Sequence, residues 1–152
     1  METSQAESLE RGSRRTPNVL TAYSVEDGIE VWSVNAGKGV YNSPVDVLVI
    51  DGEVWLSPEF RTSYDLHTGK VASELSERRD RVGMLHDRCY RNKATVNCIL
   101  TSRDGIEVID KERGWIGNNS WLRGTCQYGI MPANGLIYAP PNACACHPKV
   151  KL

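Results

Sequence analysis

Apolar residues recur with a period of two along the chain after Pro17, and this alternation decides the fold class. The run that we interpret as alternating is 29–34, Ile-Glu-Val-Trp-Ser-Val, in which Glu30 and Ser33 separate apolar residues. A strand with one buried face has this pattern, whereas an amphipathic helix repeats about every 3.6 residues. No segment has a convincing helical period, so the sequence predicts an all-β protein of antiparallel strands.

The alternating runs are short and fall into four groups separated by turns rich in glycine. The first group, 18–34, is predicted to hold two strands, and the second, 45–75, four strands that include a two-residue hairpin at Asp51-Gly52. The third, 94–122, is predicted to hold about four strands and the fourth, 128–140, two. Two further connections are expected, a loop with Gly114, Gly117 and Asn118-Asn119, and a hairpin turn over 132–135.

Length and charge narrow the possibilities further. The 152 residues suit one domain with a buried core, and 18 Lys+Arg against 19 Asp+Glu favour neither nucleic acid nor an anionic membrane as a partner. No run approaches the roughly 20 apolar residues of a membrane span. Residues 1–17 are polar and are predicted to be a disordered leader without the apolar middle of a signal peptide, which favours the cytoplasm. The five cysteines favour an oxidising compartment or a metal site instead.

Three hairpins share a pattern in which an apolar strand ends in Tyr or Ile, a turn with glycine follows, and a strand or a tryptophan comes next. They begin at Tyr23, Tyr64 and Ile109, and their turns contain Gly28, Gly69 and Gly114. Successive hairpins are 41 and 45 residues apart, a spacing typical of propeller blades.

The repeat resembles that of the pyrroloquinoline-quinone (PQQ)-type β-propellers, which include quinoprotein alcohol dehydrogenases and an outer-membrane assembly lipoprotein. The segments 86–91, 123–129, 131–135 and 139–141 are similar to a branch of large, exported PQQ-like repeat proteins of environmental bacteria. The resemblance covers about 18–152 and implies antiparallel four-stranded blades. It predicts a partial propeller of about three blades that begins and ends within a blade, without the export signal of the resembling periplasmic proteins.

A ring of three blades would leave almost no room for the inner strands. The two half-blades could pair between two chains, giving a six-blade dimer closed by symmetry. Otherwise the chain is a fragment of a larger repeat protein with open sheet edges that invite self-association. The fragment is the interpretation that we favour.

The cysteines and histidines are the candidate metal ligands, because thiolate and imidazole groups suit zinc or copper(I). The C-x-C spacing is less diagnostic than paired C-x-x-C, and C-x-x-C-H is absent. Since the resembling proteins are exported, the resemblance favours disulfides that staple loops over inert thiols and over a metal site. Cys98, in a predicted strand over 96–100, is expected to be a small buried hydrophobe. The metal candidates are His86, Cys89, Cys126, Cys144, Cys146 and His147, and the disulfide candidates are Cys89, Cys126, Cys144 and Cys146.

Neither a cofactor nor a catalytic residue is assigned. The alcohol dehydrogenases of the superfamily stack a ring of two adjacent cysteines over PQQ and hold calcium, but this sequence has no adjacent cysteines. PQQ is therefore not expected, since a fold does not fix a function. His67 is expected to cap a turn or face water. His86, Asp87 and Cys89 could be drawn as a Cys/His site, but a shared loop does not show that their side chains converge.

The tryptophans and tyrosines could form a surface for sugars or peptides, but packing between blades is the expected role. These residues are Trp32, Trp55, Tyr64, Trp115, Trp121 and Tyr138. The function expected is a non-catalytic scaffold or binding module for a protein or glycan partner. The alternative is a remnant or subunit of a quinoprotein-type or metal-dependent oxidoreductase whose site needs further blades.

Overall fold

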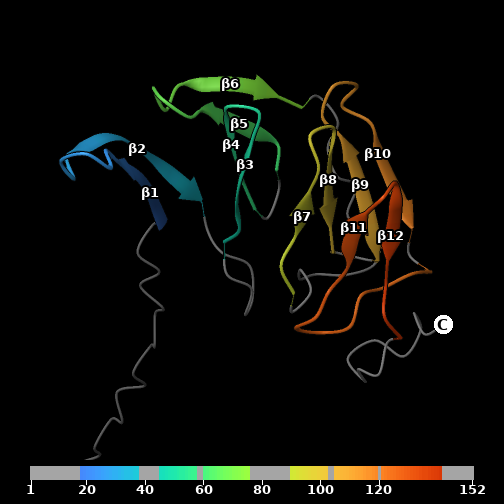
Figure 1. Ribbon diagram of the computed structural model, residues 1–152. Coiled ribbons are helices and arrows are strands. Elements are labelled where there is room, and N and C mark those ends of the chain that lie inside the picture. Colours follow the sequence, from blue (N-terminus) through green and yellow to red (C-terminus); the bar gives the residue numbers. More distant parts are fainter. Residues whose placement is uncertain are drawn as a thin grey trace, which may run out of the picture.

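The computed structural model describes residues 18–37, 45–57, 60–75, 90–102, 105–119 and 121–141, and these residues are all β, without a helix (Figure 1). The predicted leader, 1–17, lies outside them. The strands are β1 (Asn18–Tyr23), β2 (Glu30–Gly37), β3 (Val47–Ile50), β4 (Glu53–Leu56), β5 (Thr62–Asp65), β6 (Val71–Glu74), β7 (Lys93–Ala94), β8 (Cys98–Thr101), β9 (Ile106–Asp110), β10 (Ile116–Asn119), β11 (Met131–Ala133) and β12 (Leu136–Tyr138).

The predicted grouping of the strands is confirmed. The sheets are β1-β2, β3-β4-β5-β6, β7-β8-β9-β10 and β11-β12, and every pairing is antiparallel. Within each sheet the order of the strands follows the sequence, because tight turns join antiparallel strands directly. Within the described ranges none of the four sheets closes on itself.

Two of the predicted connections are wrong. The loop expected around Gly117 is strand β10, whose residues pair with β9 from Ile116 to Asn119. The Trp115 ring lies over Gly117, 2.4 Å from where a Cβ would be, so a larger residue at 117 would have to move this exposed ring. The predicted turn over 132–135 is also shorter, since Pro132 belongs to β11 and only Asn134-Gly135, both with positive φ, connects the strands.

The three hairpins that the sequence pattern aligns share one turn geometry. In each turn a glycine with φ between 66° and 71° donates its N–H to the carbonyl four residues earlier, at 2.9 Å. Only glycine adopts this left-handed conformation without steric cost. The donor and acceptor pairs are Gly28 with Ser24, Gly69 with Asp65, and Gly114 with Asp110.

The Asp65 carboxylate caps the second of these turns. Its Oδ1 accepts hydrogen bonds from the hydroxyl and the N–H of Thr68, both at 2.7 Å, and from the N–H of His67 at 3.1 Å. The Thr68 hydroxyl first, and then the backbone donors, hold the pKa of Asp65 below its usual range. His67 is exposed in this turn, as the sequence predicted.

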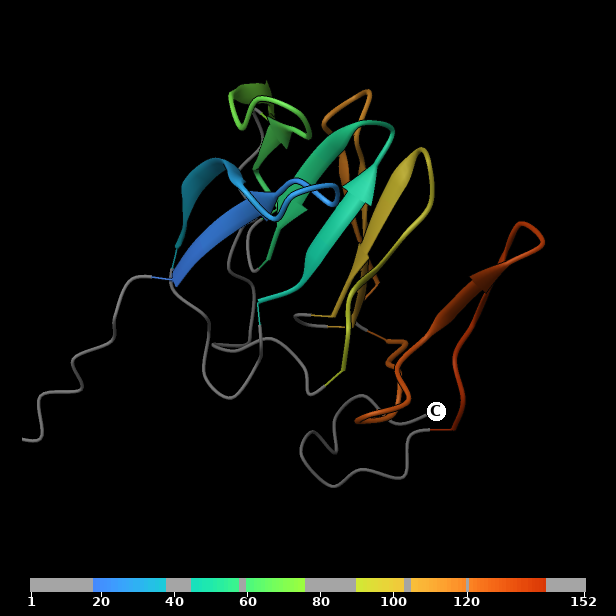
Figure 2. The same ribbon diagram turned by 60° about the vertical axis from the view of Figure 1, so that its left-hand side comes forward.

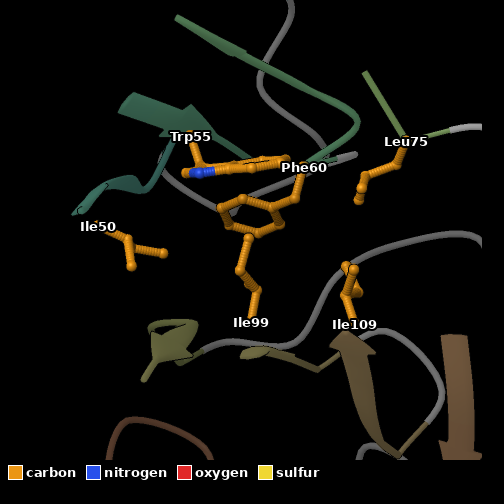
Figure 3. Close-up of a cluster of buried hydrophobic side chains, with 6 residues drawn as sticks. All are labelled: Ile50, Trp55, Phe60, Leu75, Ile99 and Ile109. Carbon is orange, nitrogen blue, oxygen red and sulfur yellow. The ribbon is translucent and has the colours of Figure 1, made fainter. Parts of the chain in front are cut away.

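The four sheets pack face to face in chain order, so each is a layer beside the next (Figures 1 and 2). The alternation of apolar and polar residues gives each sheet an apolar face that can pack on the next sheet, because successive side chains of a strand point to opposite sides. Three apolar clusters fill the three interfaces. They are centred on Trp32 and Val54, on Trp55, Phe60 and Ile99 (Figure 3), and on Tyr90, Leu100 and Ile130.

Trp32 joins the first hairpin to the next sheet. Its indole N–H donates to the Leu66 carbonyl at 2.9 Å, and its ring covers Gly69, where a Cβ would lie 2.7 Å from the ring. A side chain at Gly69 would therefore have to displace a buried tryptophan.

Gly69→Ala is expected to lower the free energy of unfolding by about 2–3 kcal/mol, because strain at positive φ adds to displacement of Trp32. Gly28→Ala is the matched control, since Gly28 has φ +71° but nothing within 4 Å of its Cβ position. That control should lose about 1 kcal/mol in the same urea titration. Equal losses in the two variants would contradict the docking of Trp32 on this turn.

Candidate functional site

The two ends of the sheets differ in character. One end carries the tight turns at 51–52, 66–69, 111–114 and 134–135. At the other end β3 and β7 begin, β4 and β8 finish, and the chain enters β11. Most of the buried polar residues lie at this second end, which we call the polar end. They are Asp46, Ser57, Asn92, Thr101, Ser102, Glu107 and Arg123.

A buried carboxylate at the polar end joins the two four-stranded sheets. Asp46 precedes β3, and its Oδ2 accepts hydrogen bonds from the backbone N–H and the side-chain amide of Asn92, which precedes β7, both at 2.8 Å. Its Oδ1 accepts from Arg91 Nη1 at 2.5 Å. Ser57 holds the backbone of Asp46 in place. The Ser57 hydroxyl accepts a hydrogen bond from the Asp46 N–H at 2.6 Å, and the Ser57 N–H donates to the Asp46 carbonyl at 3.0 Å. This network joins the segment before β3 to the segment before β7.

A second buried carboxylate, Glu107, lies on β9. It accepts hydrogen bonds from the Thr101 hydroxyl on the adjacent strand and from the Gly105 N–H at 3.4 Å. Sequence reasoning gave no signal for either carboxylate, because each is a single acidic residue within or beside an apolar run. Hydrogen bonds to protein groups satisfy both, as a buried charge requires.

The segment 121–130 connects the second four-stranded sheet to the last hairpin and has several anchors. The Thr125 carbonyl accepts from the Gly129 N–H at 2.7 Å, and the Thr125 hydroxyl donates to the Pro141 carbonyl at 2.6 Å. Gly129 has φ +69° and lies against the Tyr90 ring, 2.8 Å from where its Cβ would be. Gly124 lies so close to Gly129 that a Cβ would be 2.6 Å from its backbone. Larger residues would not fit at these two crossings.

Arg123 is buried within this segment, which is unusual for a charged side chain. Its Nη2 donates to Cys126 Sγ at 3.3 Å. Its Nε and Nη1 are also buried and have no hydrogen-bond partner in the described part of the chain. Unused buried donors are costly, so this guanidinium is suited to binding an anionic group.

The same segment exposes large aromatic side chains. Trp121 is 77% exposed and Tyr128 is 82% exposed, although the residues between them include buried Arg123 and Gly124. Rings held out by an anchored backbone lose little entropy when a partner covers them. This segment, which we call the aromatic loop, is the candidate binding site.

The expectation that six aromatic residues pack between layers holds for three of them. Trp32 and Trp55 are buried and Tyr64 is half-buried, whereas Trp115, Trp121 and Tyr138 are exposed. Of the exposed three, Trp115 follows the β9–β10 turn, Trp121 lies on the aromatic loop and Tyr138 lies on the last hairpin.

No family model, curated protein or solved structure matches the chain. What the chain binds must therefore be inferred from its own residues.

The sequence-predicted ligand set is only partly placed. Cys126 lies on the aromatic loop, and Cys98 and Cys126 are not bonded to each other. Among the described residues no group of three or more His, Cys, Asp and Glu side chains is arranged to hold a metal ion, and no helix could cross a membrane. The other candidates lie outside the described residues: His86, Cys89, Cys144, Cys146 and His147.

Cys98 is half-buried on β8, less enclosed than the sequence predicted, and it carries a free thiol. Burial first, and then the nearby Asp110 charge, raise the pKa of this thiol. A raised pKa leaves less thiolate, so iodoacetamide should label Cys98 more slowly at pH 8 in the folded protein than in urea. The rate in the folded protein should rise at higher pH than in urea. Peptide mapping by mass spectrometry measures both, and equal rates would contradict the burial of Cys98.

Proposed function

We propose that this protein is a non-catalytic binding module of β-propeller type, which holds a protein or glycan partner through the aromatic loop. The observation that carries the proposal is the pair of exposed rings, Trp121 and Tyr128, on a backbone anchored by Thr125 and Gly129. Tryptophan and tyrosine are enriched where proteins bind partners, because each offers a large apolar face and a polar tip.

The propeller-type arrangement has its own support. Two four-stranded meanders lie face to face in chain order between two hairpins, and one turn geometry recurs in three of the four layers. Blades of a propeller are repeated four-stranded sheets of this kind. Binding residues of such scaffolds lie on the loops, and here Trp121 and Tyr128 lie on a loop.

Trp121→Ala tests the proposal against a matched control, Trp115→Ala. Trp115 is also exposed, at 58%, but it follows the β9–β10 turn at the opposite end of the sheet. Loss of an exposed ring should leave the stability of both variants within about 0.5 kcal/mol of the parent. A panel of immobilised oligosaccharides and a photo-crosslinker placed at Tyr128 identify glycan and protein partners respectively.

The expected result is that the Trp121→Ala protein loses about tenfold or more in affinity for the partner found, whereas the Trp115→Ala protein does not. A crosslinker at residue 115 should capture nothing that the one at 128 captures. Equal binding by the two variants would overturn the assignment of the aromatic loop.

The alternative function, a remnant or subunit of a quinoprotein-type or metal-dependent oxidoreductase, is favoured by one observation. The two unused donors of Arg123 beside Cys126 suit an anionic ligand, and PQQ carries carboxylates. Metal analysis of the purified protein, with thiols counted before and after reduction, discriminates between the functions. Bound zinc or copper supports the oxidoreductase, whereas two disulfides without metal support the binding module.

A further inference from the structure

The strands of the two terminal hairpins correspond to particular strands of the four-stranded sheets. β7 lies beside both β3 and β11, so these three are the first strands of successive layers. β12 is therefore a second strand, like β4 and β8. The turn between β1 and β2 has the geometry of the β5–β6 and β9–β10 turns, so β1 is a third strand, like β5 and β9.

The two hairpins are thus complementary halves of one sheet. In the described part of the chain β12 has no third strand beside it, and β1 has no second strand. An open edge presents unpaired N–H and C=O groups that bind another strand. We propose that β12 of one copy pairs antiparallel with β1 of a second copy, giving a four-stranded sheet in the order β11-β12-β1-β2. Two copies related by a twofold axis form this junction twice.

The complete sheets supply the register of this junction. In the first of them Glu53 pairs with Asp65 and Val54 pairs with Tyr64. The turn Asn134-Gly135 takes the place of Asp51-Gly52, because each directly precedes the second strand of its layer.

When the complete sheet is used as the template, Leu136 occupies the position equivalent to Glu53, and Ser24 occupies the position equivalent to Asp65. Leu136 of one copy therefore lies opposite Ser24 of the other, and Ile137 lies opposite Tyr23. Each chain carries both hairpins, so the first hairpin of a second copy can complete the sheet that the last hairpin of the first copy begins.

The open edge of β12 has backbone groups in the positions that this register requires. Ala133 and Leu136 flank a two-residue turn and form a hydrogen-bonded pair, so the next pair, Pro132 and Ile137, is not hydrogen-bonded across the hairpin. Proline fits this position because it has no N–H to donate. The N–H and carbonyl of Ile137 consequently point to the open edge.

Both hairpins also have an apolar outer face that the junction would cover. Tyr138 is exposed, but it takes the place of Trp55, which is buried between two complete sheets. In the joined sheet each outer face meets a complete sheet of the other copy. The exposed residues are Val19, Tyr23 and Val31 on the first hairpin and Met131, Leu136 and Tyr138 on the last.

A cysteine pair tests the register. Directly opposite residues of a non-hydrogen-bonded pair bring their Cβ atoms close enough for a disulfide. The protein with Ser24→Cys and Leu136→Cys should give a covalent dimer under mild oxidation, twice the 16.9 kDa chain mass and lost on reduction. Ala22→Cys with Leu136→Cys is two residues out of register and should give no more dimer than the parent. Equal yields from the two pairs would overturn the proposal.

Ile137→Pro removes the free edge donor and should weaken self-association about tenfold or more in sedimentation equilibrium. Val71→Lys, a change at an exposed residue of β6, is the control and should have no such effect. If Ile137→Pro alters the circular dichroism spectrum, the cysteine pairs decide alone. A parent protein that stays monomeric at about 100 μM, or a partner strand from a different protein at this edge, would overturn the pairing of two copies.

Discussion

Phe60→Ala is expected to lower the free energy of unfolding by about 3–5 kcal/mol, because it empties the centre of the interface between the two four-stranded sheets. Phe60 is the only phenylalanine in the chain and is completely buried. Its ring lies between the Trp55 indole and Ile99 of the next sheet (Figure 3). Urea unfolding followed by tryptophan fluorescence measures the loss. Val47→Ala, at an exposed position of β3, should stay within about 0.5 kcal/mol of the parent.

The backbone of Phe60 adds a second expectation. Phe60 has φ 46° and donates its N–H to the Leu56 carbonyl at 3.0 Å, so a bulky residue occupies a left-handed conformation. Glycine relieves about 1 kcal/mol of this strain. Phe60→Gly should therefore be no less stable than Phe60→Ala, although glycine is usually the worse substitute. A loss below about 1 kcal/mol in Phe60→Ala would contradict the interface of Figure 3.

Alternation and turn residues were sufficient to predict the grouping of the strands, because both are local signals. The Gly28, Gly69 and Gly114 turns could be aligned in advance since their shared geometry requires glycine at one position. β10 could not be predicted, because Gly117 carries no strand signal. That strand exists through its pairing with β9, which no local pattern around Gly117 indicates.

The candidate site was much harder to predict from the sequence than the grouping of the strands. Nothing local separates buried Trp55 from exposed Trp121, because the difference is whether another layer packs over each ring. Burial of Arg123 depends in the same way on the path of the aromatic loop. The contacts of Asp46 with Asn92 join residues far apart in the chain, and no spacing rule relates them.

Asp46→Ala is expected to lower the free energy of unfolding by about 3–5 kcal/mol, comparable to the loss of a buried aromatic ring. The substitution leaves the backbone N–H and the side-chain amide of Asn92 without their acceptor in a buried position. Such donors lose their hydration on folding and gain nothing in return. Urea denaturation at neutral pH measures the effect.

Arg91→Ala provides the matched control, because it breaks the same ion pair from the other side. The Arg91 side chain is 60% exposed, so water replaces its contact with Asp46, and the expected loss is about 0.5–1 kcal/mol. The two expected losses differ because the Asp46 side chain is buried and loses its hydration on folding, whereas the Arg91 side chain stays hydrated. If Arg91→Ala cost as much as Asp46→Ala, the ion pair itself would hold the two sheets together. The expected inequality instead assigns that role to the two hydrogen bonds between Asp46 and Asn92, which are shielded from solvent.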